Sequence, residues 1–120
     1  MSKIIFYVNA INGGGAERVM VNLAKYFSEN GYDTTLVTSF RDTWEYPLAP
    51  TVGRLTLEEQ EVKQSRLMRN LSRISKLRRI CKEEKPDILI SFMEEPNFRA
   101  ILATRGLPVK TLVSVRNDPN

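Results

Sequence analysis

Apolar residues follow two different spacings along the chain, and the two spacings alternate. Near-continuous runs of apolar, β-branched and aromatic residues are typical of strands buried on both faces. They occupy residues 3–9, 33–39, 87–92 and 109–115, with a weaker run at 54–57. Between them, apolar residues recur three or four positions apart, as on one face of a helix. This second spacing covers residues 16–30, 65–84 and 96–105.

Glycine and proline mark the expected ends of these helices. Gly31 is expected as the residue that closes the first helix, because glycine readily adopts the left-handed conformation found there. Pro86 is expected to end the second helix, since the residue before a proline resists the helical region. Pro96 is expected near the start of the third helix, where its missing N–H costs nothing.

Strand–helix alternation with apolar strands predicts an α/β fold, a doubly wound, Rossmann-like parallel sheet with helices on both faces. Right-handed crossovers favour the strand order 3-2-1-4-5. In such a sheet a ligand binds beyond the carboxyl ends of the strands, where the direction of winding reverses. The expected site therefore gathers three loops, at residues 10–15, 93–97 and 116–120.

A glycine loop, NGGGAER, follows the first predicted strand at residues 12–18. Gly13, Gly14 and Gly15 allow the backbone to approach a ligand closely, and the next helix points its free N–H groups at the same place. A diphosphate fits such a cradle. Arg18 stands where the dinucleotide fingerprint requires glycine, and no Gly-Lys-Ser/Thr follows, so neither NAD nor a Walker loop is expected. A tight turn with no ligand remains the alternative.

Four segments in order resemble family 4 glycosyltransferases of the GT-B fold: GGGAERVMVNLA, NGYDTTLVTS, KPDILISFMEEPN and LVSVRNDP. The last is similar to bacterial members that add hexoses or N-acetylhexosamines to lipid-linked oligosaccharides. The resemblance implies a retaining transfer from a nucleotide-sugar donor to a glycan or lipid-linked acceptor. It implies that Gly14 and Gly15 face the donor diphosphate, with Gly13 supporting the turn. It places the following residues in the acceptor cleft: Glu94, Asn97, Arg116, Asn117 and Asp118.

The resemblance also implies a two-domain enzyme. Residues 1–120 are expected to be its N-terminal Rossmann-like domain, truncated before a C-terminal donor-binding domain, and the fragment is expected not to turn over alone. The alternative is a non-catalytic module of the same fold that binds a phosphorylated ligand. Such a module would bind a nucleoside diphosphate measurably without a second domain.

Positive charge is concentrated in one segment. Residues 63–85 hold nine Lys/Arg and two acids, whereas the whole chain has a net charge of +4. On a helical projection Leu67, Leu71, Ile74, Leu77 and Cys81 share one face. A second, basic stripe consists of Arg66, Arg69, Arg73 and Lys76. We expect this stripe to meet anionic lipid headgroups or the pyrophosphate of a lipid-linked acceptor, with an ordinary solvated face as the alternative. Nucleic acid is not expected, because no aromatic residues interleave with the basic ones.

Composition excludes several kinds of chemistry. The chain has no histidine and one cysteine, which excludes a Cys/His metal site and histidine catalysis by these residues. We expect no metal and no cofactor, the nucleotide-sugar being a substrate. No apolar run approaches the ~20 residues that span a bilayer, and the first residues lack the pattern of a secretory signal. We expect a cytoplasmic protein, with peripheral attachment to the inner face of the membrane as a further expectation.

Overall fold

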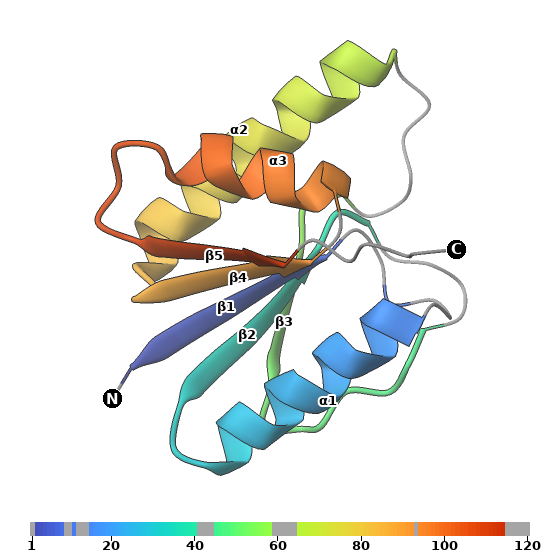
Figure 1. Ribbon diagram of the computed structural model, residues 1–120, viewed down its shortest axis with the longest axis vertical. Coiled ribbons are helices and arrows are strands. Elements are labelled where there is room, and N and C mark those ends of the chain that lie inside the picture. The colour runs from blue at the N-terminus through green and yellow to red at the C-terminus, as the bar shows by residue number, and fades with distance from the viewer. Residues whose placement is uncertain are drawn as a thin grey trace.

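The computed structural model describes residues 2–8, 11, 15–40, 45–58, 65–92 and 94–114. Strands and helices alternate in these residues as the sequence predicts (Figure 1). The strands are β1 (Lys3–Val8), β2 (Asp33–Thr38), β3 (Gly53–Thr56), β4 (Ile88–Phe92) and β5 (Lys110–Ser114). The helices are α1 (Gly15–Glu29), α2 (Arg66–Glu84) and α3 (Glu94–Thr104). Each element starts and ends within about two residues of the predicted bounds, the accuracy expected where helix ends fray.

The five strands form one sheet in the order β3-β2-β1-β4-β5. All neighbours pair in parallel, and Tyr7 of β1 lies opposite Val37 of β2 on one side and Ser91 of β4 on the other. The predicted fold class and strand order are therefore confirmed. The direction of winding reverses between β1 and β4, as expected.

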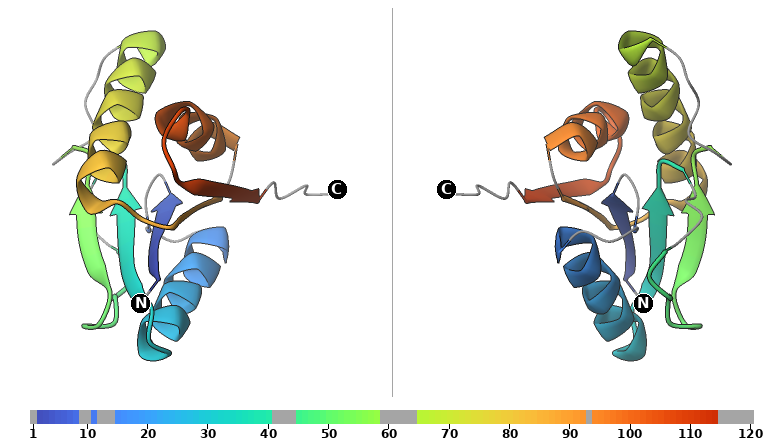
Figure 2. Two further views of the ribbon diagram at one scale, coloured as in Figure 1. Left: turned by 90° about the vertical axis from the view of Figure 1, so that its left-hand side faces the viewer. Right: turned by 90° about the vertical axis from the view of Figure 1, so that its right-hand side faces the viewer.

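Helices cover both faces of the sheet. One core lies between the sheet and α1, and it includes Ile4, Phe6 and Val8 of β1 with Met20 and Ala24 of α1. The other core lies beneath α2 and α3, on the opposite face (Figure 2). Alternate residues of β1 enter the two cores, because successive side chains of a strand point to opposite faces.

Gly31 closes α1 as predicted. Its φ is +92°, a backbone conformation that residues other than glycine rarely adopt. The N–H of Tyr32 bonds to the carbonyl of Phe27 at 3.1 Å. The rings of Phe27 and Tyr32 meet edge to face with centroids 5.3 Å apart. A six-to-one hydrogen bond with an apolar contact across it is the Schellman motif of helix ends.

The two ends of α2 also follow from local sequence. The hydroxyl of Ser65 accepts from the N–H of Met68 at 3.3 Å and caps the first turn. At the other end Lys85 takes a left-handed conformation, its N–H bonds to the carbonyl of Cys81, and Pro86 follows. Helix α3 begins at Glu94, earlier than expected, so Pro96 lies inside its first turn, where N–H groups have no helical partner.

Candidate functional site

The carboxyl ends of β1 and β4 lie side by side, and the chain leaves them in opposite directions. After β1 it enters α1 on one face of the sheet, and after β4 it enters α3 on the other face (Figure 1). Gly15 is the first residue of α1, and Glu94 is the first residue of α3. The first turns of two helices therefore begin at the predicted switch point of a doubly wound sheet.

The structure covers only part of the predicted site. Gly15 is placed at the start of α1, and the backbones of Glu94 and Asn97 form the first turn of α3, although their side chains are not described. The remaining members lie outside the described residues: Gly13, Gly14, Arg116, Asn117 and Asp118. Their roles remain predictions.

The chain that enters the glycine loop is held by the segment before β3. The carbonyl of Ile11 accepts a hydrogen bond from the N–H of Tyr46 at 2.8 Å. The neighbouring carboxylate of Glu45 accepts two bonds from Arg54 of β3, at 3.0 and 2.9 Å, and Arg54 also donates to the hydroxyl of Thr38 at 2.8 Å. A bidentate arginine–carboxylate pair fixes geometry as well as charge. It anchors residues 45–46 and thereby the carbonyl of Ile11.

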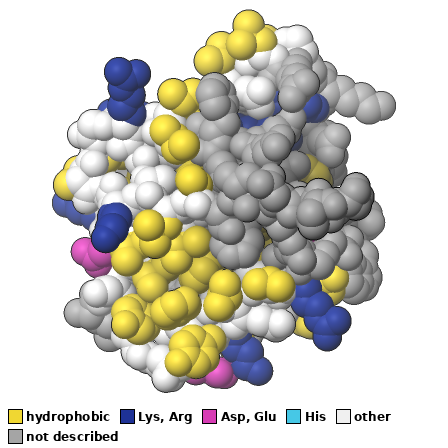
Figure 3. Space-filling view, viewed as in Figure 1, with side chains coloured by type: hydrophobic (Ala, Val, Ile, Leu, Met, Phe, Trp, Pro, Cys, Tyr) yellow, Lys and Arg dark blue, Asp and Glu magenta, His cyan; other side chains and the backbone are white. Residues whose placement is uncertain are grey.

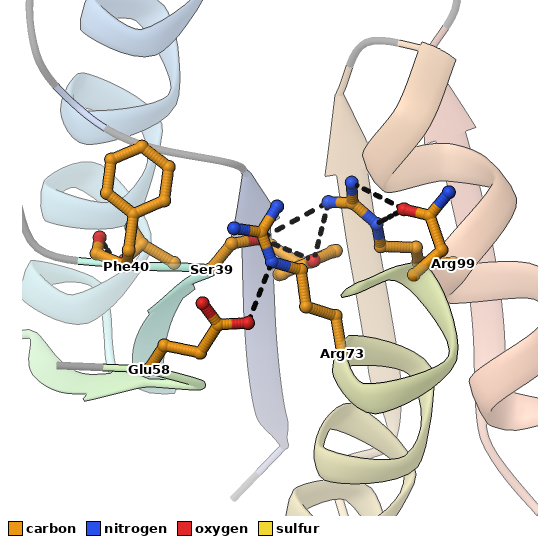
Figure 4. Close-up of polar contacts among 8 residues, drawn as sticks. Ser39, Phe40, Glu58, Arg73 and Arg99 are labelled. Carbon is orange, nitrogen blue, oxygen red and sulfur yellow. Dashed lines mark hydrogen bonds and ion pairs between the residues drawn. The ribbon is translucent and has the colours of Figure 1, made fainter. Parts of the chain in front are cut away.

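Helix α2 differs from the predicted arrangement at Arg73. Arg73 was expected on an exposed basic stripe, but it is buried, and its Nε donates to Oε1 of Glu58 at 3.0 Å. Its guanidinium also lies over the ring of Phe40, 5.7 Å from the centroid. Arg73 therefore faces the protein interior (Figure 4). The stripe's other members are Arg69, half-buried, Lys76, exposed, and Arg66, whose side chain is not described.

The apolar face predicted for α2 is wrong in its first half. Ile74, Leu77 and Cys81 pack into the core, but Leu67 and Leu71 are 68% and 55% exposed. The reason is that the first turns of α2 extend beyond the strands, where no sheet lies beneath them (Figure 1). Figure 3 shows hydrophobic side chains at that end of the molecule.

The outward face of α2 combines apolar and basic side chains. Met68, 58% exposed, lies beside Leu67 and Leu71 in the first two turns. We call these three residues the apolar tip. Further along the same helix, a groove of about 290 Å³ is lined by Ser75, Lys76, Arg78, Arg79 and Lys82. We call it the basic groove. Arg79 also pairs with Glu83 at 3.5 Å, so the groove holds one acid at its margin.

A second buried arginine, Arg99 of α3, lies near Arg73. Its guanidinium donates to the side chains of Asn70, Tyr7 and Ser39, and Figure 4 shows the bonds that run from Arg99 and the separate bond from Arg73 to Glu58. No sequence pattern predicted a role for Arg99. For Arg73, one feature of the sequence did indicate burial, because this residue precedes Leu77 by four positions and so lies on the same face of the helix. No local sequence pattern predicts which residues Arg99 bonds to.

Titratable groups with shifted pKa values lie at the opposite, amino edge of the sheet. Burial raises the pKa of the Cys81 thiol to about 11, with Arg78 opposing this shift. A hydrogen bond to Glu84 raises the pKa of Lys3. Neither shift bears on the candidate site. Among the described residues, no three His, Cys, Asp or Glu side chains group to hold a metal, and no helix is long and apolar enough to cross a membrane.

Residues 13–119 match the family described as Glycosyltransferase Family 4, so the chain belongs to that family. The chain is also similar to a protein of Campylobacter jejuni, named GalNAc-alpha-(1->4)-GalNAc-alpha-(1->3)-diNAcBac-PP-undecaprenol alpha-1,4-N-acetyl-D-galactosaminyltransferase. The two are 28% identical over 98% of this chain and 33% of the relative. The chain thus spans about a third of that relative's length. The predicted resemblance is confirmed.

Proposed function

We propose that this chain is the acceptor-side, N-terminal domain of a retaining glycosyltransferase, which moves a sugar from a nucleotide-sugar to a glycan or lipid-linked acceptor. The carrying observation is the family match over residues 13–119, because it includes the glycine loop, the first turn of α3 and the segment after β5. The name of the Campylobacter relative, with its PP-undecaprenol-linked acceptor, supports a lipid-linked acceptor in polysaccharide or oligosaccharide synthesis.

The proposed chemistry uses backbone groups to stabilise a leaving diphosphate. Negative charge grows on the diphosphate as its bond to the sugar breaks, and preorganised N–H groups stabilise such charge. Gly13, Gly14 and Gly15 allow close approach, and the N-terminal end of α1 adds its positive dipole. The proposal includes no metal and no cofactor. The acceptor side consists of Glu94, Asn97, Arg116, Asn117 and Asp118.

The test uses the full-length protein with a panel of nucleotide-sugars and a polyprenyl-diphosphate-linked glycan. Mass spectrometry should detect addition of one sugar, and NMR should show that the anomeric configuration of the donor is kept. Transfer should persist in EDTA. Tight binding of a nucleoside diphosphate without any transfer would favour the non-catalytic module, and an inverted product would refute retention.

A glycine pair supplies the matched control. Gly14→Val should raise the donor KM, because a branched side chain hinders approach of the diphosphate to the loop backbone. Gly53→Ala serves as the control, since Gly53 begins β3 at the amino edge of the sheet. The added Cβ would lie 3.1 Å from the Thr35 hydroxyl, so this variant should alter stability and leave the donor KM unchanged. Equal effects on the donor KM would contradict the assigned role of the loop.

We also propose that the outward face of α2 attaches the protein to an anionic membrane. The supporting observation is that the apolar tip and the basic groove lie on one helix. Apolar side chains bury in the headgroup boundary while basic residues near an anionic surface contribute about 1 kcal/mol each. Because Arg73 is buried, this attachment involves the outward residues of α2 in place of the predicted stripe.

Vesicle flotation tests the attachment. Lys76→Gln with Arg79→Gln and Lys82→Gln should reduce binding to vesicles containing phosphatidylglycerol, and Leu71→Ser should reduce it further. As the control, Lys25→Gln with Arg105→Gln and Lys110→Gln removes the same number of exposed positive charges from outside α2. Equal loss of binding in the control would mean that net charge alone acts, and unchanged binding in the α2 variants would refute the proposal. Stronger binding to duplex DNA than to vesicles would point to nucleic acid.

A further inference from the structure

Arg99 is a buried cation whose bonds join three parts of the fold. It is 1% exposed, and its Nε and one Nη donate to Oδ1 of Asn70 on α2, at 3.1 and 2.9 Å. The other Nη donates to the hydroxyls of Tyr7 and Ser39, both at 3.3 Å. Those two hydroxyls bond to each other at 2.8 Å. Burial of a guanidinium is unfavourable unless its donors are satisfied, so this geometry is specific.

The network lies beside the carboxyl edge of the sheet. Tyr7 is the penultimate residue of β1, and Ser39 directly follows β2. Arg99 lies in the second turn of α3, after the turn that holds Glu94 and Asn97. The guanidinium therefore ties the site end of α3 to the strand ends and to α2 (Figure 4).

Few other described contacts fix the rotation of this end of α3. Among the side chains of α3 that the structure describes, those buried in the apolar core are Ala100 and Ala103, and such small side chains interlock little with neighbours. The other side-chain hydrogen bonds that the described residues make to α3 lie at its far end. Thr104 bonds to the Ala100 carbonyl and to Thr111, at 2.8 and 2.7 Å, and Arg78 of α2 donates to the Ala103 carbonyl at 3.2 Å. A planar guanidinium gives directional bonds that alanine cannot supply.

We infer that Arg99 is a positioning residue that sets the rotation of α3, and so the orientation of its first turn, which holds positions 94 and 97. This inference rests on the proposed acceptor role of Glu94 and Asn97. A helix rotation of about 20° moves a group roughly 5–6 Å from the axis by about 2 Å. A displacement of that size is enough to impair the alignment of reacting groups.

The variants Arg99→Met and Arg99→Lys separate geometry from charge, and both are made in the full-length protein. Lysine keeps the charge but lacks the fork that reaches Asn70 and Tyr7 together. Both variants should raise the acceptor KM about tenfold, equivalent to about 1.4 kcal/mol, and leave the donor KM unchanged. Rescue by lysine would show that charge alone matters and would overturn the inference.

Thr104→Val is the matched control. It removes side-chain bonds from the other end of α3 and should lower stability without altering either KM. A raised acceptor KM in this control, or equal changes in donor and acceptor KM in the Arg99 variants, would mean that any destabilisation of α3 has the same effect. Either result overturns the inference.

Hydrogen exchange gives a readout that does not depend on activity. The amides of residues 98–100 bond to carbonyls of the first turn of α3, so their exchange reports its order. Exchange there should be faster in both Arg99 variants than in the wild type and in Thr104→Val. Unchanged exchange would overturn the inference even in an active enzyme. If the wild type transfers no sugar, the proposed function fails, and exchange still decides whether Arg99 orders this turn.

Two milder variants cover the case in which the Arg99 variants do not fold. Tyr7→Phe and Ser39→Ala each remove one hydroxyl acceptor and keep the guanidinium. Each should raise the acceptor KM roughly two- to threefold, with no change in donor KM, because each removes one hydroxyl contact and leaves the bonds to Asn70 in place. An unchanged acceptor KM in both would overturn the inference.

Discussion

The ion pair between Arg73 and Glu58 offers a stringent test of the fold. Both side chains are 3% exposed, and the contacting atoms are 3.0 Å apart. Arg73→Met leaves the Glu58 carboxylate buried without the guanidinium. Charges about 4 Å apart interact by about 4 kcal/mol at an effective dielectric constant of 20, and loss of one partner of a buried pair costs about 3–5 kcal/mol. We expect a loss of that size in the free energy of unfolding.

The double variant should behave differently from either single variant. Glu58→Met alone leaves Arg73 buried without its carboxylate and should be as costly as Arg73→Met. When both are methionine, no charge remains buried at this position, and hydrophobic replacement of a buried pair is often neutral or stabilising. The double variant should therefore unfold close to the wild-type midpoint.

Urea unfolding followed by circular dichroism measures these values. With a slope of about 1–3 kcal/mol per molar urea, each single variant should lower the midpoint by roughly 1–5 M. The control is Arg79→Met on the same helix, whose exposed pair with Glu83 should contribute about 0.3–0.5 kcal/mol. Equal effects of Arg73→Met and Arg79→Met, or a double variant as unstable as the sum of the singles, would refute the reasoning.

Three further predictions concern local features. Because burial raises the pKa of the Cys81 thiol to about 11 from its ordinary 9.0, its stabilising effect is complete below pH 9 and is lost as pH rises towards 11. The free energy of unfolding should therefore fall by about 3 kcal/mol over this pH range. Urea titrations should show that Cys81→Ala abolishes this fall, and an equal fall in the variant would contradict the assignment to Cys81. Arg54→Lys breaks the bidentate bond to Glu45, so urea unfolding should show a loss of about 1–2 kcal/mol; an unchanged midpoint would argue against the clamp. Gly31→Ala should lower the melting temperature by about 4 °C through its positive φ, and Gly31→Asn by less; the reverse order would contradict the backbone cause.

The elements and their order follow from local sequence patterns. Apolar runs and helical spacing are local properties, so they located each strand and helix without knowledge of their neighbours. Local chemistry also placed the ends, at Gly31 for α1 and before Pro86 for α2. The strand order followed from the handedness of crossovers, which depends on chain chirality and little on particular residues.

Which side of α2 is buried along its length depends on how the helix lies against the sheet. A helix of 19 residues is about 28 Å long, whereas strands of 4–6 residues are about 13–20 Å long. One end of α2 must therefore extend beyond the sheet, and in this fold it is the N-terminal end. Leu67 and Leu71 are exposed there, although their spacing fits an apolar face.

The same limit applies to the polar interior. Tyr7 and Arg99 are 92 positions apart, and no local pattern links residues at that separation. From its sequence context Arg73 is predicted to be a surface cation. In the fold, the segment after β3 places Glu58 3.0 Å from it. Local spacing determines which structure a segment forms, but burial of a charge depends on which partner the fold brings to it.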